Sequence, residues 1–114
     1  MPRDDEAYLL DMLLWARRVK SFNDGIDEPS FAADIKSQAA TLHGLQVIGE
    51  AAGKVSIDFQ AAHPEIGWHR ITGLRHRLVH DYGRIDMSLI WGIVQNDVAP
   101  LIAALEPLVP QENL

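Results

Sequence analysis

The chain has 114 residues, 47% of them apolar and 23% charged, a mixture typical of one globular domain over residues 1–114 and unlike a disordered segment. It contains no cysteine, which excludes disulfides and cysteine-ligated zinc and fits a cytoplasmic location. The net charge of −6 argues against a protein that binds nucleic acid over a broad surface. No apolar run approaches the roughly 20 residues of a membrane span.

The first predicted helix runs from Asp4 to Asn23. Acidic residues lie in its first turn and basic residues in its last turns, as the helix dipole favours, and Asp24-Gly25 ends it. Its apolar residues cover an arc too wide for a single stripe, so we expect contacts with both the core and a second subunit. These residues are Tyr8, Leu9, Leu10, Met12, Leu13, Leu14, Trp15, Val19 and Phe22.

The second predicted helix begins after Pro29, with Ser30 as its N-cap, and continues to Gly53. Helical spacing predicts that its buried residues are Phe31, Ile35, Ala39, Leu42, Leu45 and Ile48. Gly44 and Gly49 are poor helix formers, so close packing against another helix is the expected reason for them. A short additional helix, residues 56–63, ends before Pro64.

The third predicted helix covers residues 68–82, and the fourth covers residues 86–108 with Asp86 as its cap. Pro100 is expected to kink or divide the fourth helix. No segment alternates as a strand would. The predicted fold is therefore all-α: an up-and-down bundle of four main helices with one short additional helix.

Basic side chains are concentrated in one window, although the whole chain is acidic. Residues 69–84 hold four of the ten Lys and Arg residues, three of the five His residues and a single acid, Asp81. This distribution predicts one focused site for an anion.

Arg75 and His80 within this window are suited to phosphodiester chemistry. Arginine donates paired hydrogen bonds to phosphate oxygens and stabilises developing negative charge. Histidine can exchange a proton with a ribose hydroxyl near neutral pH. On one helix, however, the two positions are about 140° apart, so a joint site requires an irregular helix end or a second subunit. The alternative is a solvated polar face on which His80 caps the helix end.

The string Gly73-Leu-Arg-His-Arg-Leu-Val-His-Asp-Tyr82 resembles the HepT family of HEPN toxins, in which Arg, four residues, His, one residue and Tyr form the hallmark. The segments Ile48-Gly49-Glu50, residues 64–71 and residues 85–97 resemble the same family. The resemblance implies a HEPN domain that cleaves RNA from a dimer cleft without metal or cofactor. It implies that Arg75 and His80 are catalytic.

The same resemblance implies a partner and a mode of control. HepT-like toxins pair with an MntA-type nucleotidyltransferase antitoxin, which transfers AMP to the motif tyrosine, here Tyr82. Two positions depart from the family pattern: His76 stands where asparagine is common, and Gly83 stands where a bulky aromatic residue is usual.

Three further residues are candidate supporting groups: His76, Glu50 and Arg77. His76 could share in proton transfer. With His80 it also has the spacing of zinc ligands on a helix, with Glu50 as a third ligand, a less favoured reading. Glu50 either orients the catalytic pair or simply faces water. The alternative function is a non-catalytic HEPN module that binds a nucleotidyltransferase or a nucleotide.

Overall fold

The computed structural model describes residues 3–78, 85–110 and 112, apart from the side chains of Arg3 and Arg75. Across these residues the regular elements are α-helices and short 3-10 turns, with no β-strand among them. The predicted all-α class is confirmed.

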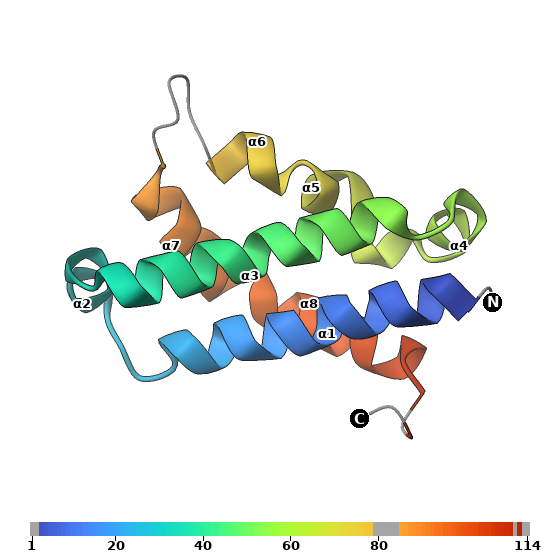
Figure 1. Cartoon of the computed structure of the whole chain (residues 1–114), viewed down its shortest axis with the longest axis horizontal. Helices are drawn as coiled ribbons and strands as arrows, with labels where there is room; N and C mark the ends of the chain where they lie inside the picture. Colours follow the sequence, from blue (N-terminus) through green and yellow to red (C-terminus); the bar gives the residue numbers. More distant parts are fainter. Residues whose placement is uncertain (1–2, 79–84, 111, 113–114) are drawn as a thin grey trace.

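Two long antiparallel helices form one side of the molecule (Figure 1). Helix α1 spans Arg3–Asn23, within one residue of the prediction, and α3 spans Ile35–Lys54. Helix α8 (Val98–Leu105) packs on another side of α1. These two helices cover much of the wide apolar arc of α1, but Leu10 and Leu14 are only half-buried and Phe22 is exposed. The expected contact of this arc with a second subunit stays a prediction.

The predicted second helix is two helices, which corrects its start and its cap. Helix α2 (Glu28–Ala33) is capped by Asp27, whose carboxylate accepts a hydrogen bond from the Ser30 amide; Ser30 is therefore inside the helix. The chain is extended at Asp34 (φ −111°, ψ 98°), and the Asp34 carboxylate caps α3 by accepting from Lys36 and Ser37 amides.

This break interrupts the helical spacing between Phe31 and Ile35. Phe31 is buried as predicted, but Ile35 is 78% exposed and Ala39 is also exposed. Leu45 and Ile48 in the middle of α3 are buried as predicted.

The next elements are short. Helix α4 (Ile57–Ala62) is capped by Ser56, which confirms the predicted short helix, and η1 (Pro64–Ile66) follows. Asp5 of α1 holds this junction, because its buried carboxylate accepts hydrogen bonds from the Ser56 amide (2.8 Å) and hydroxyl (2.7 Å).

The predicted third helix is also divided. Helix α5 (Trp68–Thr72) and α6 (Leu74–Leu78) are separated by a turn at Gly73, where ψ is near zero. Backbone hydrogen bonds from Gly73 to His69 and from Arg77 to Gly73 keep the two pieces in line. Residues 79–82, the predicted end of this helix, lie outside the described residues.

The predicted fourth helix consists of α7 (Met87–Asn96), α8 and the 3-10 turn η3 (Glu106–Leu108). The Asp86 carboxylate accepts from the Leu89 amide, which confirms the predicted cap. The division falls at Asp97 because Pro100 lacks the amide hydrogen that would bond the Asn96 carbonyl. This confirms that the helix is divided near Pro100.

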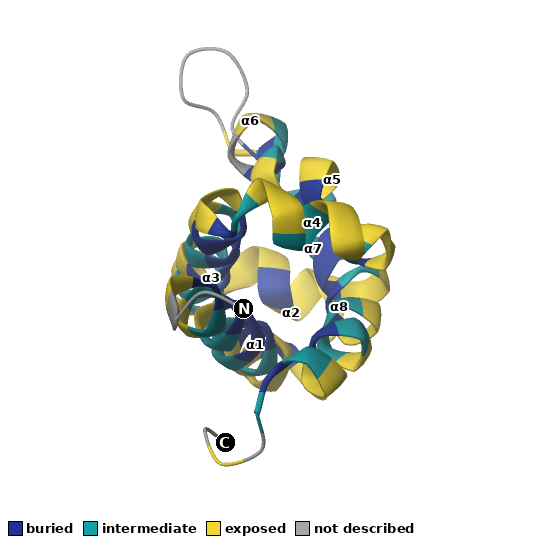
Figure 2. Ribbon diagram, turned by 90° about the vertical axis from the view of Figure 1, so that its right-hand side faces the viewer, coloured by how far each residue is buried: buried dark blue, intermediate teal, exposed yellow. Residues whose placement is uncertain are grey.

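The buried apolar residues face inward, between the α1–α3 pair and the α7–α8 pair (Figure 2). They come from every α-helix except α4, and Leu9, Met12, Leu78, Ile90 and Leu105 are fully buried. Phe22, which belongs to the predicted apolar arc, is 39% exposed in the last turn of α1. In the described part of the chain no single helix has the length and apolarity to cross a membrane, and only α7 with α8–η3, bent by 43°, passes that test as a pair.

Candidate functional site

Helix α6 carries the first half of the predicted motif. Leu74 and Leu78 are buried and anchor α6 on the core, and Ile71 of α5 is buried on the same side. Helical spacing in the sequence predicts that Ile71, Leu74, Leu78 and Tyr82 form one core stripe, and the burial of the first three confirms this part of the prediction. Gly49 of α3 lies beneath the α5–α6 junction, where an added Cβ would be 3.1 Å from the Ile71 carbonyl oxygen.

The predicted catalytic residues can be followed only in part. The backbone of Arg75 belongs to α6, its side chain is not described, and both His80 and Tyr82 lie outside the described residues. A backbone hydrogen bond connects the two sides of residues 79–84: the Asp86 amide donates to the Leu78 carbonyl oxygen at 3.1 Å. The roles of Arg75, His80 and Tyr82 therefore stay predictions.

Two of the supporting residues are on the surface. His76 is exposed on α6, next to Arg75 in the chain. Glu50 is exposed on α3, where its carboxylate forms a 3.5 Å ion pair with Lys54. Glu50 also borders a hollow with Gln46 of α3 and Thr72 of α5. These contacts favour the solvent-facing interpretation of Glu50.

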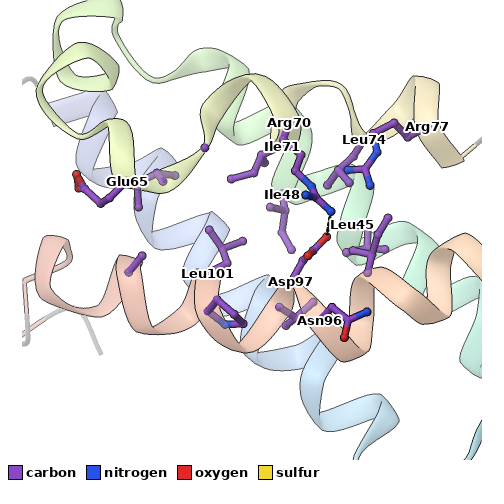
Figure 3. A pocket seen from close by; sticks show the side chains of 16 residues that line it. Leu45, Ile48, Glu65, Arg70, Ile71, Leu74, Arg77, Asn96, Asp97 and Leu101 are labelled. Atoms are coloured by element: carbon purple, nitrogen blue, oxygen red, sulfur yellow. Dashed lines mark hydrogen bonds and ion pairs between the residues drawn. The ribbon is translucent and has the colours of Figure 1, made fainter.

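The third supporting residue, Arg77, is partly buried and lies elsewhere around α6. Positions 75 and 77 are about 200° apart on a helix, so they belong to opposite faces. Arg77 lines a cavity of about 200 Å³ between α5–α6 and α7–α8 (Figure 3). Its Nη1 atom is buried, without a hydrogen-bond partner among the described residues.

The same cavity contains an ion pair that sequence reasoning missed. Arg70 of α5 donates to the Asp97 carboxylate at 2.8 Å, and this contact joins α5 to the α7–α8 junction (Figure 3). The two residues are separated by 27 positions, so no local spacing connects them. In the sequence, Arg70 is recognisable only as one of the basic residues in the window 69–84.

The described residues contain no group of three His, Asp or Glu side chains that could hold a metal ion. The zinc arrangement considered for His76, His80 and Glu50 includes a residue outside that part of the chain. It gains no support from the exposed Glu50, which pairs with Lys54.

Comparison with known proteins identifies relatives along nearly the whole chain. Residues 12–108 match the "Ribonuclease HepT-like" family. The "Probable ribonuclease HepT" of Thermococcus cleftensis is 32% identical over 95% of this chain and 98% of its own length. A Methanocaldococcus jannaschii protein whose name describes an RNase is 36% identical over 91% of this chain and 95% of its own.

No solved structure matches the chain. The family match spans α3, α5, α6 and α7 and includes the whole segment from Gly73 to Tyr82. The relatives cover both the helices that support this segment and the segment itself. The chain therefore belongs to the HepT-like ribonuclease family.

Proposed function

We propose that this HepT-like ribonuclease cleaves RNA with Arg75 and His80 and acts as the toxin of a toxin–antitoxin pair. The observation that carries the proposal is the family match over residues 12–108, because the matched segment contains Arg75, His80 and Tyr82 at the family spacing. The described part of the basic window lies on α5 and α6, which agrees with this proposal.

The chemistry needs no metal because RNA supplies its own nucleophile. His80 takes the proton of a ribose 2′-hydroxyl, and the 2′-oxygen attacks the adjacent phosphorus. The bond from phosphorus to the 5′-oxygen breaks, and that oxygen receives a proton. Arg75 stabilises the negative charge on the phosphorane. The products are a 2′,3′-cyclic phosphate and a 5′-hydroxyl.

His76 is the candidate donor of the second proton. It is exposed on α6 and adjacent to Arg75, so a substrate at the surface of α6 can reach its imidazole. Histidine is also the side chain that most often acts as a general acid or base. Glu50 pairs with Lys54, and we propose no direct role for it in the reaction.

Control of the toxin is assigned to Tyr82 and to a nucleotidyltransferase antitoxin of the MntA type. The tyrosine oxygen attacks the α-phosphorus of ATP, pyrophosphate leaves, and the phenolic proton is lost. The AMP group would add negative charge and bulk two residues from His80 and so occupy the anion site. The pair is proposed to act in the cytoplasm, where its RNA substrate is present.

Expression without the antitoxin tests catalysis. The wild type is expected to arrest growth, and Arg75→Ala and His80→Ala are expected to abolish the arrest at equal protein level. Purified protein should cut a single-stranded RNA in the presence of EDTA and leave 2′,3′-cyclic phosphate ends. The same oligonucleotide with 2′-deoxyribose at the cleavage position should stay intact, because it lacks the nucleophile.

Two outcomes would contradict this function. Full toxicity of His80→Ala at equal expression would show that the catalytic pair is wrong. Binding of the nucleotidyltransferase by a wild-type protein that neither cuts RNA nor arrests growth would favour the non-catalytic binding module instead.

A further inference from the structure

The cavity between α5–α6 and α7–α8 lies outside the proposed chemistry, because Arg77 faces it from the side of α6 opposite position 75. It has a volume of about 200 Å³. Its walls are mainly aliphatic and include Leu45 and Ile48 of α3, Leu74 of α6 and Leu101 of α8 (Figure 3). A smaller apolar cavity, of about 150 Å³, is enough to hold benzene in another protein.

Arg77 places one cationic group in this apolar space. Its guanidinium extends from α6 toward α7, beside the Arg70–Asp97 pair (Figure 3). The Nη1 atom is shielded from solvent and meets no hydrogen-bond acceptor among the described residues. A guanidinium stays charged at every physiological pH, so a buried, unpaired N–H of this group is unfavourable until an acceptor reaches it.

The other charged residues of the cavity lining already have partners. Arg70 and Asp97 neutralise each other at 2.8 Å. Glu65, which lies far from Arg77 in the same view, is within 3.3 Å of the His63 ring (Figure 3). Of the described lining residues, Arg77 is therefore the one charged side chain that makes no hydrogen bond or ion pair within the described part of the chain.

The aliphatic walls and the unpartnered Arg77 guanidinium together indicate which chemical class of ligand the cavity fits. One unpaired guanidinium matches one negative charge, whereas a phosphate dianion calls for more donors than the cavity offers. The described lining has no aromatic side chain on which a nucleobase would stack. A carboxylate on a hydrocarbon or phenyl body satisfies both the donor and the apolar walls.

We infer that this cavity binds a small organic carboxylate, with the carboxylate on Arg77 and the apolar body against Leu45, Ile48 and Leu101. The inference does not depend on the RNase mechanism, because none of these residues takes part in it. Its failure would leave the proposed function untouched.

Benzoate and hexanoate are suitable probes, with benzamide as the neutral analogue of benzoate. Isothermal titration calorimetry on the intact protein should show millimolar or tighter binding of the carboxylates, and benzamide should bind about tenfold or more weakly. Arg77→Met keeps the aliphatic stem and should weaken benzoate binding by a similar factor. Arg18→Met is the matched control, because Arg18 is exposed and stacks on Trp15 of α1 instead, 4.6 Å from the ring centre.

A second variant keeps the inference testable if Arg77→Met does not fold. Leu101→Phe fills the cavity and retains Arg77, so it should also reduce benzoate binding. The inference is overturned if benzamide binds as tightly as benzoate, or if no carboxylate binds at millimolar concentration. It is also overturned if AMP or inorganic phosphate binds through Arg77 more tightly than benzoate.

Discussion

At the scale of single residues, aspartate and serine side chains determine where several helices begin. Asp27, Asp34, Ser56 and Asp86 each accept a hydrogen bond from a backbone amide in the first turn of the following helix. Such caps satisfy amides that have no partner inside the helix. The Asp34 cap matters most for the fold, because it separates α2 from the long helix α3.

Asp34 is expected to make stability depend on pH in the acid range. The Ser37 hydroxyl (2.8 Å), with the amides of Ser37 and Lys36, lowers the pKa of the Asp34 carboxyl below its ordinary value of 3.8. A carboxyl with a lowered folded-state pKa stabilises the protein above pH 3.8 and loses that contribution as the pH falls through the folded value.

Urea unfolding at several pH values measures this effect. The wild type should lose stability more steeply below pH 3.8 than Asp34→Asn, which still caps the helix but does not titrate. Ser37→Ala removes the largest cause of the shift and should give an intermediate slope. Parallel curves for all three proteins would show that Asp34 does not contribute to the acid response.

Tyr82 is predicted to be the residue that receives AMP. The chain has only two tyrosines, and the other, Tyr8, is partly buried in α1 against the core. After incubation with the partner nucleotidyltransferase and ATP, fragment mass spectra should place an adenylyl group on Tyr82. Tyr8→Phe should be modified normally, while Tyr82→Phe should remain unmodified and active. Adenylyl mass on another residue would refute the assignment.

At the scale of elements, the contact between α1 and α3 depends on a glycine. A Cβ added to Gly44 would overlap Cγ2 of Val19 and approach Trp15 to 3.4 Å. Val19 is fully buried and β-branched, so it has little freedom to move. The close packing that the sequence suggested for Gly44 is confirmed.

Gly44→Ala is therefore expected to destabilise the protein by about 1–3 kcal/mol, because α1 and α3 must separate to admit the methyl group. Gly92→Ala is the matched control in α7, where nothing lies within 4 Å of the added Cβ. It should stabilise by about 0.5–1 kcal/mol, since alanine is the better helix former. Thermal unfolding of both variants measures the difference, and equal effects would contradict the close-contact explanation.

At the scale of the whole molecule, α3 and α8 cover much of α1 within one chain, so the apolar arc of α1 is a weaker argument for a dimer than the sequence suggested. The dimer proposal now rests on the spacing of Arg75 and His80, which are about 140° apart on a regular helix. A site that combines Arg75 of one protomer with His80 of the other would remove this geometric problem.

Sedimentation is expected to give twice the 12.7 kDa mass of the chain. Mixing inactive Arg75→Ala with inactive His80→Ala, after subunit exchange, should restore part of the RNase activity, because one of the two composite sites in each heterodimer is intact. No restoration in a demonstrated heterodimer would place both residues of a site in one protomer. A monomer that retains RNase activity would eliminate the composite site altogether.

The sequence by itself determined the helical class, the span of α1 and the motif that identifies the family. These features are local: helical spacing of apolar residues, capping side chains and a short string of residues. The cap at Asp86 and the core positions Ile71, Leu74 and Leu78 could be predicted on this basis.

Only the tertiary structure decided where the long predicted helices divide and which surfaces they share. Ile35 is exposed because the chain changes direction at Asp34, and helical periodicity does not continue across such a break. The Arg70–Asp97 pair and the cavity around Arg77 bring together residues from α3, α5, α6, α7 and α8. Contacts of this kind depend on how helices pack in space, which no pattern along the chain encodes.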